Sequence, residues 1–243
     1  MNHKSGGTFF WKKRVGQTCF LCDERAITGE HVPPKGFFPT SLRMNLNLLR
    51  IPACFKHNNN SKLDDEYART ALAIGSPEST TGLQLFEERV ISAALQGREG
   101  LLAAINRQMK PVFYRHTSGI LEPRFSYELD KQRVQVVMDK IARGLFWHHT
   151  GSRVPNNYCV SPYVRNRSWN DTAVSLIWSL PIFAIGNKDV FEYRYGGLVD
   201  QQNRFRVYIA MNIFGTNKIE IFIHHIKYRP PTITANAAKL LGD

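Results

Sequence analysis

The sequence predicts an α+β protein in three parts: a module stabilised by a bound metal ion in residues 1–75, a helical connector in 76–110, and an α+β domain with an antiparallel sheet in 111–243. Three observations lead to this prediction. Two pairs of metal-binding residue types stand in the first part, a long amphipathic helical pattern begins at residue 130, and segments after residue 190 alternate apolar and polar residues. The 243 residues suffice to bury a sizeable core.

The first part contains Cys19 and Cys22 as a C-x2-C pair, and Cys54 and His57 as a C-x2-H pair after 31 intervening residues. Structural zinc sites have four tetrahedral thiolate and imidazole ligands, which leave no open position for a substrate. In a chain with four cysteines and the character of a cytosolic protein, this spacing favours metal over a disulfide. We therefore expect a structural Cys3His zinc site. The alternative is that the cysteines are buried apolar side chains and that His57 has another role.

The connector is predicted from helical spacing of apolar residues. One short stripe follows Asp64, a second runs from Leu83 to Leu95, and a third helical stretch covers 99–109. Pro111 then ends the helical pattern, and residues 112–127 predict mixed strand and turn.

The third part is predicted from one helix and a sheet. The helix should run from Asp130 to His148, with Gly151 just past its end, because apolar residues recur on one face at Val134, Val137, Met138, Ile141 and Leu145. Apolar and polar residues alternate in 190–195, 205–213 and 219–223. These segments predict an antiparallel meander against which the helix packs.

The charge balance predicts a polyanionic partner. Thirty-two Lys and Arg against 20 Asp and Glu give a net charge of +12, and residues 1–62 alone hold ten Lys or Arg and three Asp or Glu. Such a balance favours nucleic acid or an anionic surface as partner. No secretory signal is visible at the start, and the longest uncharged run, 172–187, is too short to cross a bilayer. We expect a cytoplasmic protein without membrane association.

The residues around the two metal pairs contain a recognisable motif. Glu30-His31-Val32-Pro33-Pro34-Lys35 lies between the pairs, Asn47-Leu48 precedes Cys54, and Asn58 follows His57. Over about residues 15–70 the chain resembles the zinc-containing HNH endonucleases of the ββα-metal superfamily, in particular those whose first element has this Glu-His-Val-Pro-Pro-Lys sequence.

The resemblance implies a role for each matching residue. His31 would be the general base, Glu30 and Asn58 would be ligands of one catalytic magnesium or manganese ion, and Asn47 would brace the loop that holds the His31 strand. The chain departs from the pattern in two places: Asn58 replaces a histidine, and His57 replaces the last zinc-ligating cysteine. His57 could itself be the third motif residue, with zinc short of one ligand, but the x2 spacing favours His57 on zinc.

These residue types also suit phosphodiester hydrolysis when they are considered independently of the resemblance. An imidazole accepts a proton from water near neutral pH, and carboxylate or carbonyl oxygens suit a hard divalent ion. Glu30 and His31 are adjacent on an expected strand, so they should point to opposite faces unless a bulge or twist brings both to one phosphate. Five basic residues could contact phosphates, although a solvated charged face explains each of them equally well: Lys35, Arg43, Arg50, Lys56 and Lys62.

Two functions from different classes are compatible with these features. The first is a metal-dependent HNH endonuclease acting on nucleic acid, DNA before RNA. Its residues 111–243 would regulate it, bind substrate, or form a homodimer or partner contact, as in the effectors of bacterial antiviral defence that such two-part proteins resemble. The second is a non-catalytic zinc-stabilised protein that binds nucleic acid. The joint presence of Glu30, His31 and Asn58 favours the enzyme.

Overall fold

The computed structural model describes residues 17–88, 103, 107, 109–115, 118–164, 175, 177–199 and 204–227. Over these residues it is a mixed α+β protein, with an N-terminal hairpin and helices beside a Cys/His cluster and a five-stranded antiparallel sheet after them. Among the described helices, none combines the length and the apolar character needed to cross a bilayer.

The N-terminal hairpin joins β1 (Thr28–Val32) to β2 (Leu49–Ala53) in continuous antiparallel register, which places Glu30 opposite Ile51 and His31 opposite Arg50. The connection between the strands forms two 3-10 turns, η1 (Lys35–Phe37) and η2 (Thr40–Asn45). Three helices follow β2: α2 (Phe55–Asn59), α3 (Lys62–Ile74) and α4 (Thr80–Phe86).

The expected helix from Leu83 to Leu95 therefore starts within α4, and its part beyond residue 88 lies outside the described residues. The expected helix over 99–109 also lies almost wholly outside them, although residues 103 and 107 are helical. The segment predicted as mixed strand and turn forms a second hairpin, β3 (Met109–Arg115) and β4 (Leu121–Tyr127).

The helix predicted from Asp130 is confirmed as α7 (Lys131–Thr150). The Asp130 side chain accepts a hydrogen bond from the backbone N–H of Arg133, which caps the first turn. Gly151 ends the helix in the left-handed region at φ 69°, a conformation that costs glycine little because it has no Cβ.

The predicted meander is confirmed as part of a five-stranded antiparallel sheet with the order β5-β9-β8-β7-β6. Phe205–Ile213 is β8, and the segments expected over 190–195 and 219–223 correspond to longer strands. The other four strands are β5 (Tyr158–Val164), β6 (Ile182–Ala184), β7 (Phe191–Val199) and β9 (Asn217–His225).

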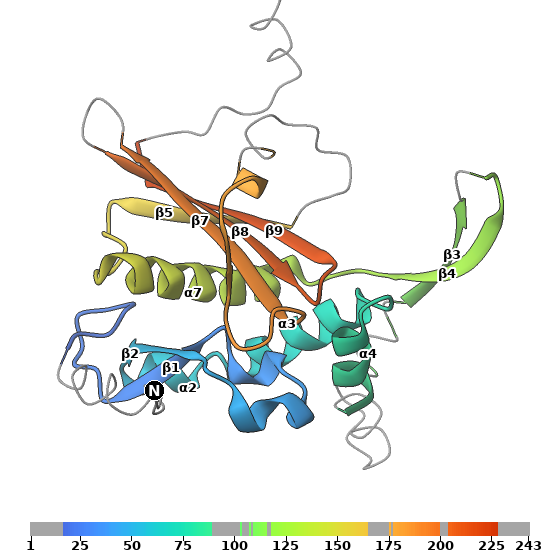
Figure 1. The fold of residues 1–243 in the computed structure, drawn as a ribbon, viewed down its shortest axis with the longest axis horizontal. Helices are drawn as coiled ribbons and strands as arrows, with labels where there is room; N and C mark the ends of the chain where they lie inside the picture. Colours follow the sequence, from blue (N-terminus) through green and yellow to red (C-terminus); the bar gives the residue numbers. More distant parts are fainter. Residues whose placement is uncertain are drawn as a thin grey trace, which may run out of the picture.

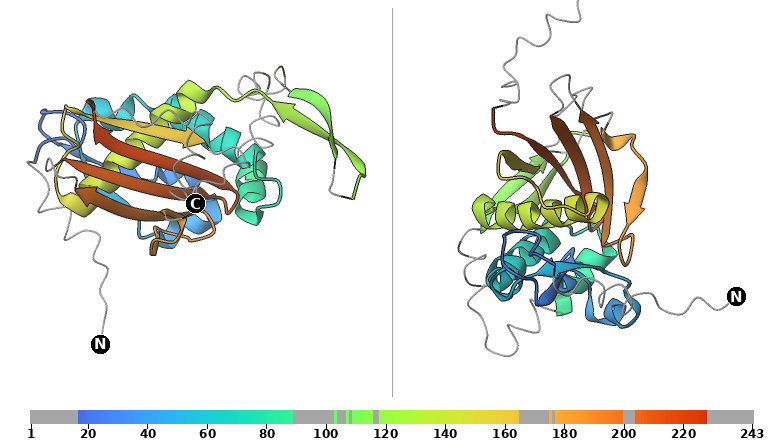
Figure 2. Two further views of the ribbon diagram at one scale, coloured as in Figure 1. Left: turned by 90° about the horizontal axis from the view of Figure 1, so that it is seen from above. Right: turned by 90° about the vertical axis from the view of Figure 1, so that its left-hand side faces the viewer.

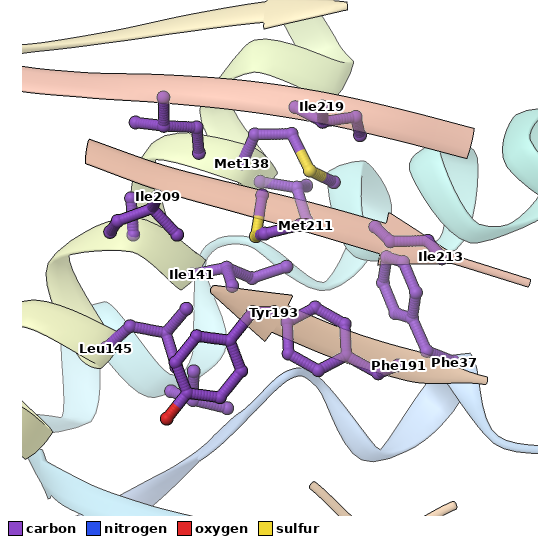
Figure 3. Close-up of a cluster of buried hydrophobic side chains, with 14 of the residues drawn as sticks. Phe37, Met138, Ile141, Leu145, Phe191, Tyr193, Ile209, Met211, Ile213 and Ile219 are labelled. Atoms are coloured by element: carbon purple, nitrogen blue, oxygen red, sulfur yellow. The ribbon is translucent and has the colours of Figure 1, made fainter. Parts of the chain in front are cut away.

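Helix α7 lies between the sheet on one side and the N-terminal hairpin on the other (Figures 1 and 2). On the sheet side, Met138, Ile141 and Leu145 point toward side chains of the sheet such as Ile209 and Met211 (Figure 3). All five of these side chains are fully buried. Their burial gives the sheet and the helix their main apolar stabilisation.

On the hairpin side, α7 approaches closely at Gly144. A Cβ at this position would lie 2.6 Å from Val32 Cγ2 and 2.8 Å from Ile51 Cδ1, so glycine is required for the contact. One hydrophobic cluster consequently extends from β1 and β2 through α7 into the sheet. The division at residues 75 and 110 remains a prediction, but the first and third parts share this core.

Candidate functional site

The two cysteine-containing pairs come together as the sequence predicts. The ligand atoms of Cys19, Cys22, Cys54 and His57 all lie within 4.8 Å of one another. Cys19 Sγ is 3.5 Å and Cys54 Sγ is 3.2 Å from Nδ1 of His57, and the Sγ atoms of Cys22 and Cys54 are 3.9 Å apart. A tetrahedron with Zn–S of about 2.3 Å and Zn–N of about 2.0 Å separates its ligands by about 3.5–3.8 Å. The cluster is a candidate structural zinc site.

Local backbone structure holds both pairs in place. The first pair lies in a tight turn closed by the Thr18–Arg25 bridge, and the N–H of Leu21 points at Cys19 Sγ at 3.5 Å. This turn is joined to β2 because the N–H of Phe20 donates to the carbonyl oxygen of Pro52 at 2.9 Å. Cys54 is the N-cap of α2, so His57 follows one helical turn later on the same side. A metal ion in the cluster would fasten the turn to the start of α2.

A cleft of about 450 Å³ opens beside the cluster, between β1, the η1 turn and α3. Its lining includes three of the four residues that the motif predicts as the catalytic set: Glu30, His31 and Asn58, without Asn47. Two of the five predicted phosphate contacts, Lys35 and Lys62, also line it. The structure thus places five of the predicted residues in one cleft.

His31 is half-buried on β1 at the edge of the cleft. Burial lowers the pKa of its imidazole below the ordinary value, and the nearby positive charges of Arg50 and Lys35 lower this pKa further. The neutral imidazole, which can accept a proton, is therefore the favoured form at neutral pH.

Glu30 is buried and contacts a residue far along the chain. Its Oε1 lies 3.3 Å from Nζ of Lys140 on α7, and this ammonium also donates to Asp65 at 2.7 Å and to Ser61 Oγ at 2.7 Å. Both Glu30 and Lys140 are about 95% buried. Burial raises the pKa of the Glu30 carboxyl, an effect that the Lys140 charge opposes and the Asp65 charge reinforces.

Glu30 and His31 both line the cleft although they are neighbours on a strand whose pairing has no bulge. They differ in depth, because Glu30 reaches inward to Lys140 while His31 is only half-buried. Asn58 is held by the start of β1, since its Nδ2 donates to Thr28 Oγ1 at 3.0 Å.

The remaining predicted residues lie elsewhere. Asn47 is exposed in the segment before β2 and is not part of the cleft lining, so its bracing role stays a prediction. Arg43 braces the η1–η2 turns, because its Nε donates to the carbonyl oxygen of Phe38 at 2.8 Å. Arg50 is exposed opposite His31, and Lys56 is exposed on α2.

Four charged residues of this region have no role in the sequence-based prediction: Lys140, Asp65, Glu66 and Arg69. Arg69 lines the cleft and pairs with Glu66 at 3.0 Å. The sequence around Lys140 did indicate that it is buried. Lys140 falls between Val137 and Gly144, on a second and less regular apolar face of α7. A lysine at helical spacing from such residues indicates a buried cation with a carboxylate partner.

The cleft has a donor set that fits a divalent ion such as magnesium. The Glu30 and Asp65 carboxylates and the Asn58 amide offer oxygen atoms, the ligand type that magnesium and manganese prefer. Lys140 contacts Oε1 of Glu30, and a carboxylate has further lone pairs to share. Both oxygens of Asp65 also lie 2.7 Å from the Lys140 ammonium, so an ion bound here would share both carboxylates with that cation.

Comparison with known proteins adds no relative. No family model, no curated protein and no solved structure matches this chain. Any function must therefore be argued from the residues of the cleft and the cluster.

Proposed function

We propose that the protein is a metal-dependent endonuclease of the HNH type, which hydrolyses phosphodiester bonds in DNA. One observation carries the proposal: Glu30, His31 and Asn58 line a single cleft directly beside the Cys3His cluster. A protein that only binds nucleic acid needs cationic side chains, but it does not need an imidazole next to a set of oxygen ligands.

His31 is proposed as the general base. Its lowered pKa keeps the imidazole neutral, so it can take a proton from the water that attacks the phosphorus atom. A divalent ion held by the cleft would supply charge neutralisation at the phosphate and at the leaving 3′ oxygen.

The cationic side chains of the cleft are proposed to position the substrate. Lys35 and Lys62 are exposed at the wall of the cleft, where their ammonium groups can contact phosphates on either side of the scissile bond. Such contacts fix the position of the strand without reading its sequence.

The Cys3His cluster is proposed to hold zinc in a structural role. Cys54 is the N-cap of α2, and His57 lies in its first turn, directly before Asn58. Zinc bound there would fix the start of α2, and with it Asn58, relative to Thr28 on β1. The cluster therefore supports the geometry of the cleft without taking part in the chemistry.

Conversion of supercoiled plasmid in magnesium tests this function. Wild type should nick or linearise the plasmid, and His31→Ala should cut at least about 100-fold more slowly, because it lacks the proton acceptor. His148→Ala is the matched control, since His148 is exposed at the end of α7.

Cleavage by His31→Ala at the wild-type rate would contradict the proposal. Absence of cleavage by wild type on double-stranded DNA, single-stranded DNA and RNA, together with retained binding, would favour the non-catalytic zinc protein instead.

A further inference from the structure

The β3–β4 hairpin extends away from the rest of the protein (Figures 1 and 2). It is anchored at its base, where the Tyr127 hydroxyl donates to the carbonyl oxygen of Ala71 on α3. Burial at this point raises the pKa of Tyr127 to about 12, so the hydroxyl remains a donor at all physiological pH values. The hairpin is thus a fixed arm and not an extension of the sheet.

The register divides the arm into two faces of different character. Directly paired residues of an antiparallel ladder point to the same side. Pro111 pairs with Phe125, Phe113 pairs with Pro123, and Arg115 pairs with Leu121, which makes one face almost wholly apolar. The register places six residues on the opposite face: Lys110, Val112, Tyr114, Glu122, Arg124 and Ser126.

The apolar face is uncovered. Phe113 is 75% exposed, Phe125 is 73% exposed and Leu121 is 54% exposed. A two-stranded hairpin is at best marginally stable in water by itself, and an apolar face gains free energy when it is covered. The arm therefore has the composition of a surface that packs against another.

Addition of a strand to the arm is blocked. Pro111 and Pro123 lie on the same face, one in each strand, and each is paired across the ladder with a phenylalanine. A proline in a two-stranded ladder must have its nitrogen on the outer edge, where it offers no N–H to a further strand. A partner must therefore approach the side chains of the face.

Nucleic acid is a poor match for this face. Phosphate binding needs cationic side chains, yet Arg115 is the one cation among the paired residues of the apolar face and lies at its outer end. Lys110 belongs to the opposite face.

A second copy of the same face is a good match. With about 200 Å² for a whole phenylalanine, Phe113 and Phe125 expose about 300 Å², and the two prolines and Leu121 bring one arm to about 500 Å². Two such faces in contact would bury about 1,000 Å², which is the lower limit for a specific interface and corresponds to a weak dimer. A contact between two copies of this face is symmetric, because the apolar side chains of one copy pack against the same side chains of the other. Arg115 stays at the periphery of this contact.

We propose that the apolar face of the β3–β4 arm packs against the same face of a second copy of this chain, which gives a two-fold symmetric dimer. Two layers of two strands would then enclose Phe113 and Phe125 of both copies. Where the proposed nuclease function also holds, a dimer carries two clefts and can cut both strands of a duplex. This last consequence rests on the proposed function, whereas the dimer itself does not.

Sedimentation equilibrium of the full zinc-loaded chain tests the dimer without any measurement of activity. Wild type at about 100 µM should have twice the chain mass of 27.8 kDa. The double variant Phe113→Ser/Phe125→Ser should dissociate at least about 100-fold more readily, because the buried aromatic anchors are lost. Val112→Ser/Tyr114→Ser on the opposite face is the matched control and should behave as wild type.

A monomeric wild type at that concentration would overturn the proposal, as would a Phe113→Ser/Phe125→Ser variant that dimerises as wild type does. Zinc content and the melting temperature of the separated monomers verify that each variant is folded, since all four side chains are exposed. Loss of binding to an oligonucleotide or to anionic vesicles by this double variant, with wild type monomeric, would assign the face to that ligand instead.

Discussion

Two hairpins of the described residues, β1–β2 and β3–β4, each form a separate two-stranded sheet, and their surroundings are opposite. The β1–β2 hairpin is covered by α7 and joined to the Cys3His cluster, and its Val32 and Ile51 are fully buried. The β3–β4 hairpin is longer, yet its Phe113 and Phe125 are about three-quarters exposed. Two strands cannot stabilise themselves, so the comparison teaches where each hairpin obtains its support. The first obtains it within the chain, and the second is proposed to obtain it from another copy.

The largest effect is expected from removal of the metal support of the first hairpin. Cys54→Ser should abolish zinc binding and lower the melting temperature strongly, because the binding free energy of a structural zinc ion is folding free energy. Elemental analysis of zinc per chain and thermal unfolding measure both effects.

Cys159→Ser is the matched control, because Cys159 lies on β5 outside the cluster. It should retain one zinc per chain. Full zinc content and an unchanged melting temperature in Cys54→Ser would contradict the ligand assignment.

The second effect concerns the support that α7 gives to the same hairpin. Lys140→Ala should destabilise the protein by about 3–5 kcal/mol, because it leaves the buried Glu30 carboxylate and Asp65 without their shared cation. Chemical denaturation measures this loss. Lys131→Ala, at the exposed start of α7, should change stability by less than about 0.5 kcal/mol.

The loss in Lys140→Ala should depend on pH. The pKa of Glu30 is raised in the folded protein, so its contribution to stability is present at low pH and is lost as the pH rises through that pKa. The deficit of the variant should consequently shrink as the pH falls and the carboxyl groups become protonated. A deficit independent of pH would point to lost packing of the lysine stem instead.

The smallest effect is expected at the outer surface of the first hairpin. Arg50→Gln should raise the pKa of His31, since the Arg50 charge is one of the causes that lower it. The lowered pKa of His31 contributes stability above the ordinary pKa, and this contribution is lost as the pH falls through the folded value. The acid limb of any His31-dependent cleavage should shift to higher pH in the variant.

An NMR titration of the His31 ring measures this shift independently of activity. Lys56→Gln, on α2, is the control and should leave the titration unchanged. An identical His31 titration in wild type and Arg50→Gln would show that the Arg50 charge does not lower this pKa.

The sequence was sufficient where a feature depends on local spacing. The two x2 pairs predicted the Cys3His cluster, and apolar spacing predicted α7 and the strands around β8. Glu30, His31 and Asn58 line one cleft, and the roles that the resemblance assigns to them stay predictions.

Features that depend on distant packing could not be predicted. The carboxylate partners of Lys140 cannot be identified until α7 is placed against β1. The close approach at Gly144 likewise depends on Val32 and Ile51, which are distant in the sequence. The alternation rule also placed Glu30 and His31 on opposite faces, and only the depth of each side chain explains how both line the cleft. The local sequence pattern predicts the strands of the arm, but it does not predict that the arm is separate from the five-stranded sheet.

The Glu30–Lys140 contact also sets an order of events during synthesis. Its two residues are separated by 110 positions, so Glu30 leaves the ribosome well before its cation exists. At ~5–20 residues per second, Lys140 is added roughly 5–20 seconds after Glu30. Until then the Glu30 carboxylate stays hydrated and the cleft has no wall behind it. A nascent chain therefore cannot complete this cleft until translation has passed α7.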